Sequence, residues 1–221
     1  MRPWMLEAPP LPISPDAEAA FWAALEGPAP LPAGWPRWQF LQWVAAQGFL
    51  LHGSPQSDLT LFEPRTPHDL SPDDFSKRAG VFAASDGLWA MMYALRDRSR
   101  VARMLNMALQ VRGVDGWSSM RYFLSLAPRE GTVTDGAALL TPGTVYVLPP
   151  EGFGPMPPYD WSGLGTVREP QWLHAGPVRP LRRVPVIPAD FPLPVGTHDA
   201  ARTDALAAAD PWGFPWPGAR E

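Results

Sequence analysis

The chain has 221 residues, no cysteine, a formal net charge of −4 at pH 7, and 46% hydrophobic residues. This length suits one domain with additional terminal segments, and the apolar content is sufficient for a core. The weakly negative charge gives no basic surface of the kind that binds nucleic acid. Without cysteine there is no disulfide and no thiolate for catalysis or for structural zinc. Because no apolar run of about 18 residues and no signal-peptide hydrophobic region is present, we expect a cytoplasmic protein without a membrane span.

Thirty prolines set the organisation of the chain. They concentrate in 3–36, 142–158 and 170–217, which indicates long extended segments and disfavours an all-helical fold. We therefore divide the chain into three parts. These are a Pro-rich N-terminal arm with one helix (1–36), a main domain (37–192) and a Pro/Trp-rich C-terminal tail (193–221).

Three helices are predicted outside the central motif. Residues 17–26 follow Ser-Pro-Asp at 14–16, a typical N-cap with proline in the first turn, and glycine ends this helix. A second helix is predicted over 35–47, with Gly48 as its stop. A short helix is predicted over 200–209.

The strand predictions rest on apolar and alternating runs. The predicted strands are 49–51, 81–84, 120–127, 143–148 and 178–187, the last near a sheet edge because prolines interrupt it. Residues 101–112 fit either a helix or a strand. Residues 55–78 are predicted to be loop, and 96–100 to be a charged helix end.

The chain is organised around the stretch from Gly48 to Arg98. An apolar run at 49–51 ends on His52-Gly53-Ser54, where a histidine and bare backbone at a strand end can reach a ligand. The second strand runs into a helix that begins at Ser85-Asp86. Apolar and aromatic residues then recur at helical spacing: Leu88, Trp89, Met92, Tyr93 and Leu95.

This order of motifs resembles the His-Tyr-Glu branch of the ADP-ribosyltransferases, which includes poly(ADP-ribose) polymerases and rifampin-modifying enzymes. In that branch a strand ends in His-Gly-Ser or His-Gly-Thr, and a second strand runs into a helix that carries another aromatic residue. The corresponding parts here are Leu51-His52-Gly53-Ser54, Val81-Phe82-Ala83-Ala84 and Tyr93. Residues 37–192 also resemble a bacterial group with an L-L-H-G-S motif.

The resemblance implies a catalytic glutamate near the start of a late strand, where its charge stabilises the positive charge that develops as nicotinamide leaves the ribose. Two positions compete for this role. Glu169 has the required carboxylate, whereas Gln171 stands directly before Trp172, where related sequences often have Glu-Trp. An amide cannot supply the charge. Because positions 169 and 171 point to the same side of an extended segment, both can face the ligand.

The resemblance also implies an NAD site. The Gly53 backbone can bind the nicotinamide carboxamide, His52 a ribose hydroxyl, and an aromatic ring can stack on the pyridine. The residues expected to bind NAD are His52, Gly53, Ser54, Phe82, Ala83, Ser85 and Tyr93. Those expected to be catalytic are Glu169, His52 and Gln171.

Structural interpretations stand beside these assignments. A strand-end histidine can simply bond to backbone, the aromatic residues can belong to the core, and Glu169 can be a solvated loop carboxylate. Asp58, Arg65 and Asp69 are expected to be solvated, although the resembled family has its adenosine side in this region. His68, His174 and His198 lack ligand-like spacing, so no metal is expected. Phosphate-loop, dinucleotide-fingerprint and nucleophile-elbow motifs are also missing.

We therefore expect an α+β fold in which split antiparallel sheets surround an NAD cleft with flanking helices. The leading hypothesis is ADP-ribosyl transfer from NAD, or NAD hydrolysis, in a toxin or defence effector. The acceptor is a protein, a nucleic acid or a small molecule. The alternative is a catalytically inactive fold of this type that binds a nucleotide or a protein. The aromatic tail with Trp212, Phe214 and Trp216 is expected to fold back onto its own domain or to dock on a protein partner.

Overall fold

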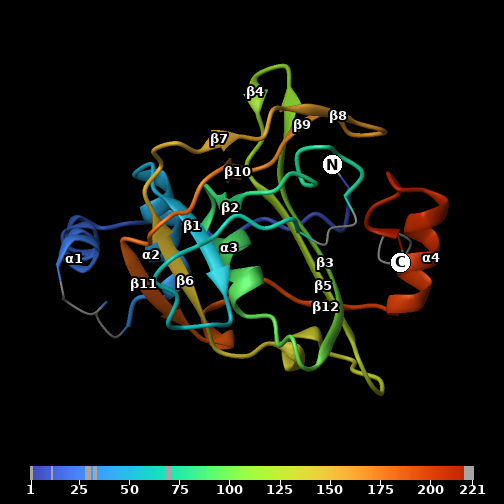
Figure 1. Ribbon diagram of the computed structural model, residues 1–221, viewed down its shortest axis with the longest axis horizontal. Helices are drawn as coiled ribbons and strands as arrows, with labels where there is room; N and C mark the ends of the chain where they lie inside the picture. Colours follow the sequence, from blue (N-terminus) through green and yellow to red (C-terminus); the bar gives the residue numbers. More distant parts are fainter. Residues whose placement is uncertain (1, 11, 28–30, 32–33, 68–70, 217–221) are drawn as a thin grey trace.

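The computed structural model describes residues 2–10, 12–27, 31, 34–67 and 71–216 (Figure 1). The helices are α1 (Pro15–Glu26), α2 (Arg37–Ala46), α3 (Gly87–Ala94) and α4 (Ala200–Ala209), with 3-10 turns η1 (Gly136–Leu139) and η2 (Pro188–Asp190). The strands are β1 (Leu50–Ser54), β2 (Val81–Ala84), β3 (Val101–Gly113), β4 (Gly116–Trp117), β5 (Arg121–Pro128), β6 (Gly143–Leu148), β7 (Gly154–Pro155), β8 (Tyr159–Trp161), β9 (Gly165–Arg168), β10 (Gln171–His174), β11 (Arg182–Val186) and β12 (Gly196–Thr197).

The strands form two sheets. The first has the order β11-β6-β1-β2-β10-β7 and is antiparallel throughout. The second has the order β12-β5-β3-β9-β8, with β4 paired to β3, and only the β12–β5 pair is parallel. The chain is therefore α+β with mainly antiparallel sheets, as the sequence predicts.

Helix α3 links the two sheets. It contacts β1, β2 and β6 of the first sheet and β3 of the second, and α2 packs against it (Figure 1). The main core forms around α3 from buried residues of both sheets and of α2: Phe40, Leu41, Leu51, Leu88, Met91, Leu124, Leu126 and Val145. Helix α1 adds Phe21 and Ala24 to the same core, so part of the N-terminal arm packs against the main domain.

A buried carboxylate fixes the start of α3. Asp86 is the N-cap, and its Oδ1 accepts a hydrogen bond from the Trp89 amide at 2.8 Å. Its Oδ2 accepts from the Tyr122 hydroxyl at 2.7 Å and from Gln42 Nε2 at 3.1 Å. Gln42 Oε1 in turn accepts from the Gly87 amide at 2.9 Å. Burial raises the pKa of Asp86, and this network joins α2, α3 and β5 at one point.

The backbone of α3 lies directly against the first sheet. A Cβ atom added to Gly53 of β1 would come within 1.8 Å of the Ala90 carbonyl oxygen. One added to Gly143 of β6 would come within 2.0 Å of the Ala94 carbonyl oxygen. Helix packing therefore requires glycine at these two positions.

Most predicted elements are confirmed, including β2, β6 and α4 with their predicted bounds. The ambiguous segment 101–112 is a strand, because β3 pairs with β5 along most of its length. As predicted, β11 lies at a sheet edge.

Three expectations are wrong. The first predicted strand, 49–51, is too short, because pairing with β6 carries β1 through His52-Gly53-Ser54, where the strand ends. Helix α3 ends at Ala94, so the charged residues 96–100 follow the helix. Short strands from β7 to β10 lie in a Pro- and Gly-rich region where no strand was predicted. Among the described residues, no helix has the length and apolar character needed to cross a membrane.

The contact between α3 and β1 leads to a stability prediction. Gly53→Ala should lower the free energy of unfolding by about 3 kcal/mol or more, because backbone atoms cannot move aside as a flexible side chain can. Gly154→Ala is the matched control, since a Cβ atom there meets nothing within 4 Å. It should change stability by no more than about 0.5 kcal/mol. Urea denaturation measures both variants, and equal stability would contradict the packing argument.

Candidate functional site

The first sheet opens between β1 and β2. In the described part of the chain, their ladder comprises the single pair Leu51↔Ala84, whereas β1 pairs along its whole length with β6. The Ser85 amide donates to the Pro170 carbonyl, next to β10, at 2.8 Å, so Ser85 directs its backbone groups away from β1. Because backbone groups alternate along a strand, Ala84 directs its N–H and C=O toward β1. It follows that Leu51 and Gly53 both direct their N–H and C=O groups toward β2. At Leu51 these groups pair, and at Gly53 they face the opening.

His52 spans the opening. Its Nδ1 lies 2.7 Å from the Phe82 carbonyl oxygen of β2, and its ring lies 4.6 Å from that of Phe62. Because a carbonyl only accepts, Nδ1 carries the proton. Burial lowers the pKa of His52, and the positive charges of Arg98 and Arg65 lower it further. The ring is therefore neutral at pH 7, and Nε2 is a hydrogen-bond acceptor.

A cavity of about 430 Å³ lies at this opening, within the range of small-ligand sites. It contains seven of the residues proposed from the sequence: His52, Gly53, Ser54, Phe82, Ala83, Tyr93 and Gln171. Tyr93 comes from the last turn of α3 and is 38% exposed. Residues of the motifs at 52–54, 81–84 and 93 therefore line one cavity.

Three arginines also line this cavity. They are Arg65 from the loop before β2, and Arg96 and Arg98 from the segment after α3; among the described residues, Glu63 is the acidic residue that lines this cavity. Burial and the neighbouring Arg98 lower the pKa of Arg96. The described lining of the cavity therefore carries more positive than negative side chains, which favours anionic groups such as a diphosphate.

A second cavity of about 310 Å³ adjoins the first. Four residues line both: Trp89, Tyr93, Arg96 and Gln171. The rest of its wall comes from β3, β8, the 71–73 loop and the C-terminal tail. Glu169 lies in this second cavity, where its Oε1 accepts a hydrogen bond of 2.5 Å from the Tyr159 hydroxyl.

The structure separates the two candidates for the catalytic carboxylate. Gln171 opens β10, pairs with Ala84 and lines both cavities, and its Nε2 donates to Ser76 Oγ at 3.2 Å. Glu169 lines the second cavity and not the first, so of the two residues only Gln171 lines the cavity that contains His52.

Of the other residues that were expected near the ligand, some line a cavity and others do not. Ser85 lines neither of the two cavities, and its amide is bonded to Pro170. Arg65 lines the first cavity, Asp58 lines neither, and Asp69 lies outside the described residues. No group of three or more His, Asp or Glu residues within the described ranges could hold a metal ion.

Sequence reasoning missed Phe62, Arg96 and Arg98 as cavity residues. Phe62 lies in a loop, where it bridges to Val178, so its position depends on a contact far along the chain. The arginines left a clearer signal, because a charged run directly after an aromatic helix is also the pattern of an anion site. Comparison with models of protein families, with curated proteins and with solved structures finds no match for this chain.

The lowered pKa of His52 leads to a pH prediction. The folded protein favours the neutral ring, so this contribution to stability is complete above the unfolded pKa of 6.5 and is lost as the pH falls toward the folded pKa. His52→Asn keeps a donor at the position of Nδ1 but cannot titrate. Between pH 6.5 and 5, the free energy of unfolding should therefore fall more steeply in the wild type than in the variant. Urea denaturation at several pH values measures this difference, and parallel curves would contradict the burial of a neutral ring.

Proposed function

We propose that the first cavity binds NAD in an ADP-ribosyltransferase-like cleft, and that the protein transfers ADP-ribose from NAD to an acceptor or to water. One observation carries this proposal. His52, the free edge of Gly53, Tyr93 and Gln171 line a single cavity at the point where β1 and β2 separate. The sequence motifs suggested the resemblance, and the geometry supplies independent support for it.

In this proposal each part of NAD meets a suitable group. The nicotinamide carboxamide has one donor and one acceptor, which match the C=O and N–H of Gly53. The pyridine ring stacks on Tyr93, and the neutral Nε2 of His52 accepts a hydrogen bond from a ribose hydroxyl. The diphosphate is held by the lining arginines Arg65, Arg96 and Arg98.

The reaction breaks the bond between C1′ of the ribose and the nicotinamide nitrogen. The bonding electron pair leaves with nicotinamide, and positive charge develops on the ribose. A carboxylate close to this charge lowers the barrier. We assign this role to Glu169, because it lies two residues before Gln171 and lines the cavity that shares Gln171, Tyr93 and Trp89 with the His52 cavity.

Gln171 favours a second candidate function. It occupies the position next to β2 within the His52 cavity, and an amide there can hydrogen-bond to ribose without stabilising the developing charge. The same cleft would then bind NAD or another nucleotide without cleaving it. The two candidates share the binding site and differ in turnover.

NAD should raise the melting temperature, because a ligand that binds only the folded state stabilises it by mass action. His52→Asn keeps the bond to Phe82 but loses Nε2, so NAD affinity should fall about 10-fold or more. His174→Asn is the matched control, since His174 lines neither cavity. Thermal shift and calorimetric titration measure both variants. An unchanged melting temperature of the wild type at millimolar NAD would remove the ligand from the proposal.

Turnover separates the two candidate carboxylate positions. Glu169→Gln keeps the acceptor for the Tyr159 hydroxyl, so NAD binding should persist while nicotinamide release falls roughly 100-fold. If position 171 carries the chemistry instead, Gln171→Glu should raise release and Glu169→Gln should do little.

Nicotinamide release is measured first without an acceptor and then with cell lysate. Absence of release from the wild type, with none gained by Gln171→Glu, would leave binding without cleavage as the function.

A further inference from the structure

The second sheet, like the first, is open beside one of its strands. Strand β9 pairs with β3 at Gln110 and Val111, and the chain then crosses from β9 to β10 of the first sheet. Among the described residues, no strand pairs with the part of β3 before Gln110 on this side, whereas β5 pairs along the other side. One side of β3 is therefore an edge inside the sheet, and its backbone groups there need partners other than a neighbouring strand.

The second cavity lies along this open edge. Six consecutive residues of β3, from Ala102 to Met107, line it. Successive side chains of a strand point to opposite faces of the sheet, so a cavity on one face would meet every second residue. Because this cavity meets all six residues, it lies beside the strand, where backbone groups as well as side chains reach it.

The pairing of β5 shows which backbone groups lie at the open edge. Tyr122 of β5 exchanges backbone hydrogen bonds with Leu6 in both directions, each at 2.9 Å, so it forms none with Ala108, its partner in β3. Because backbone groups alternate along a strand, Met104 and Asn106 direct their N–H and C=O groups away from β5, as Ala108 does. In the part of the chain that the structure describes, Met104 and Asn106 have no backbone hydrogen-bond partner at this edge.

Aromatic rings flank the open edge on the inner face of the second sheet, which faces α3. The Trp89 indole N–H donates to Asn106 Oδ1 at 2.6 Å, and the ring of Tyr93 lies 6.1 Å from that of Trp89. Both aromatic residues belong to α3 and line the cavity. A side chain that an added strand directed to this face would therefore meet aromatic surface.

The outer face carries a second group of rings beside the same edge. Phe214 packs against Phe123 with ring centroids 5.5 Å apart. Phe123 pairs with Met107, one residue beyond Asn106, so it lies on the face opposite to Asn106. The rings that line the cavity from β8 and the tail are Tyr159, Trp161, Trp212, Phe214 and Trp216.

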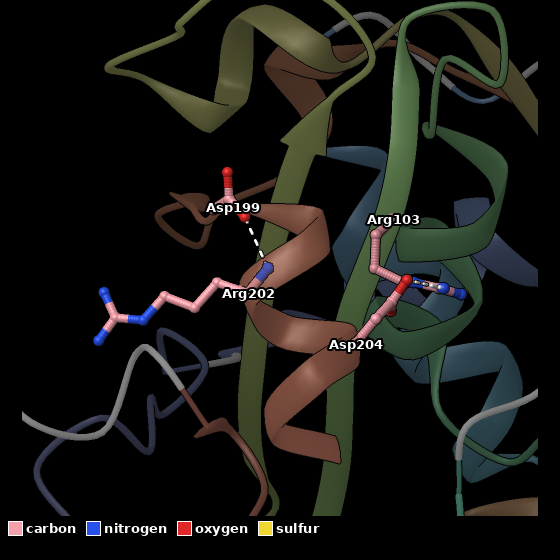
Figure 2. Close-up of polar contacts among 4 residues, drawn as sticks. All are labelled: Arg103, Asp199, Arg202 and Asp204. Atoms are coloured by element: carbon pink, nitrogen blue, oxygen red, sulfur yellow. Dashed lines mark hydrogen bonds and ion pairs between the residues drawn. The ribbon is translucent and has the colours of Figure 1, made fainter. Parts of the chain in front are cut away.

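Helix α4 holds the tail on this outer face. Arg103 of β3 pairs with Asp204 of α4 at 2.7 Å (Figure 2). His198, just before the helix, has its Nδ1 2.8 Å from Ser125 Oγ of β5. Residues 212–216 follow α4 after a short connection, so these contacts keep their rings beside β3.

We propose that the open edge of β3 binds an extended peptide of a partner protein, which joins the second sheet as an additional strand in line with β9. Met104 and Asn106 present donors and acceptors about 7 Å apart, which is the repeat of an extended peptide backbone. The stretch from Ala102 to Met107 is about 17 Å long and takes about five residues of a strand. Since rings lie on both faces of the edge, the peptide carries apolar side chains at successive positions.

The edge fits a peptide better than a second copy of this chain. Its backbone groups are recessed, because rings of α3 lie on one face and rings of β8 and the tail lie on the other. Two recessed edges cannot approach to the spacing of paired strands, about 5 Å. Peptide binding is a role beyond the proposed function, since it needs neither NAD nor the His52 cavity.

Hydrogen exchange of the full chain without NAD, followed by NMR for each amide, tests the edge. The probe is acetyl-Thr-Val-Trp-Val-Thr-amide, a neutral peptide of strand-forming residues. In the free chain, the amides of Met104 and Asn106 should exchange faster than those of Leu105 and Met107, which donate to β5. Peptide at about ten times its Kd should slow exchange at Met104 and Asn106 roughly 10-fold. Equal protection of all four amides in the free chain, or no slowing by the peptide, would overturn the edge site.

Two methylated forms of this peptide separate strand addition from simple burial of apolar side chains. N-methylation of both valines removes the N–H groups on one edge of the extended peptide, and N-methylation of the tryptophan and the last threonine removes those on the other. Only one edge of the peptide faces β3. Calorimetric titration should therefore show that one form binds about 10-fold or more weakly than the other. Equal affinities of the two forms would contradict strand addition.

Met104→Pro removes an N–H group at the open edge and none that donates to β5, and proline is tolerated at strand edges. It should weaken peptide binding several-fold or more, and its melting temperature shows whether it is folded. Trp212→Leu removes a ring that is 41% exposed and should also weaken binding. Trp117→Leu is the matched control, because Trp117 is a partly exposed tryptophan of β4 that lines neither cavity.

Wild-type affinity in both Met104→Pro and Trp212→Leu, or an equal loss in Trp117→Leu, would overturn the peptide site. If Met104→Pro does not fold, Trp212→Leu and the methylated peptides decide the outcome. Sedimentation of the full chain distinguishes the other occupant. Self-association that the peptide disrupts would assign the edge to a second copy and overturn the partner peptide.

Discussion

The position of the α3 aromatic rings relative to His52 depends on the direct contact of the α3 backbone with β1 and β6. Only glycine at positions 53 and 143 lets the helix lie on the strands at this distance, since a Cβ atom at either would meet a carbonyl oxygen of α3. The helix carries Trp89 and Tyr93 to the wall that both cavities share. A helix packed at the usual distance on side chains would lie farther out and would take these rings away from His52.

Gly53 illustrates why a glycine in a motif is weak support for a ligand on its own. Its Cα hydrogen faces α3, while its N–H and C=O lie in the plane of the sheet and point toward β2. These directions are nearly perpendicular, so the residue can serve helix packing and ligand binding together. Helix packing alone explains the glycine. The stronger argument for a ligand is that the β1–β2 ladder stops at Leu51, which leaves a polar backbone edge beside a cavity.

The parts of the fold that could be predicted are those set by nearby residues. Ser14 caps α1 through the Ala17 amide, and the Asp86 cap marks the start of α3. What could not be predicted depends on partners far along the chain. Residues 101–112 fit a helix or a strand until pairing with β5 decides the outcome, and β1 extends past His52 because β6 pairs with it. The short strands β8 to β10 have too few residues to show an alternation of their own.

The candidate site was predictable to the same degree. The position of its carboxylate could not be predicted, for a related reason. Local motifs placed His52, Phe82 and Tyr93 at one cavity, but the carboxylate depends on where the chain crosses between sheets. Arg168 ends β9 by pairing with Gln110 of the second sheet, and Gln171 begins β10 by pairing with Ala84 of the first. Glu169 lies in the crossing, which places its carboxylate in the second cavity beside Tyr159.

The crossing between the sheets places the charge of Glu169 and the amide of Gln171 at different cavities. Glu169 already accepts a 2.5 Å hydrogen bond from Tyr159, so its charge is partly engaged within the protein itself. Gln171 is placed at the His52 cavity but carries no charge. A charge at an adjoining cavity acts through space over a low-dielectric wall of Trp89 and Tyr93, where electrostatic effects fall off slowly. The separation of the charge from the hydrogen-bonding amide is therefore compatible with the proposed stabilisation of positive charge on a ribose.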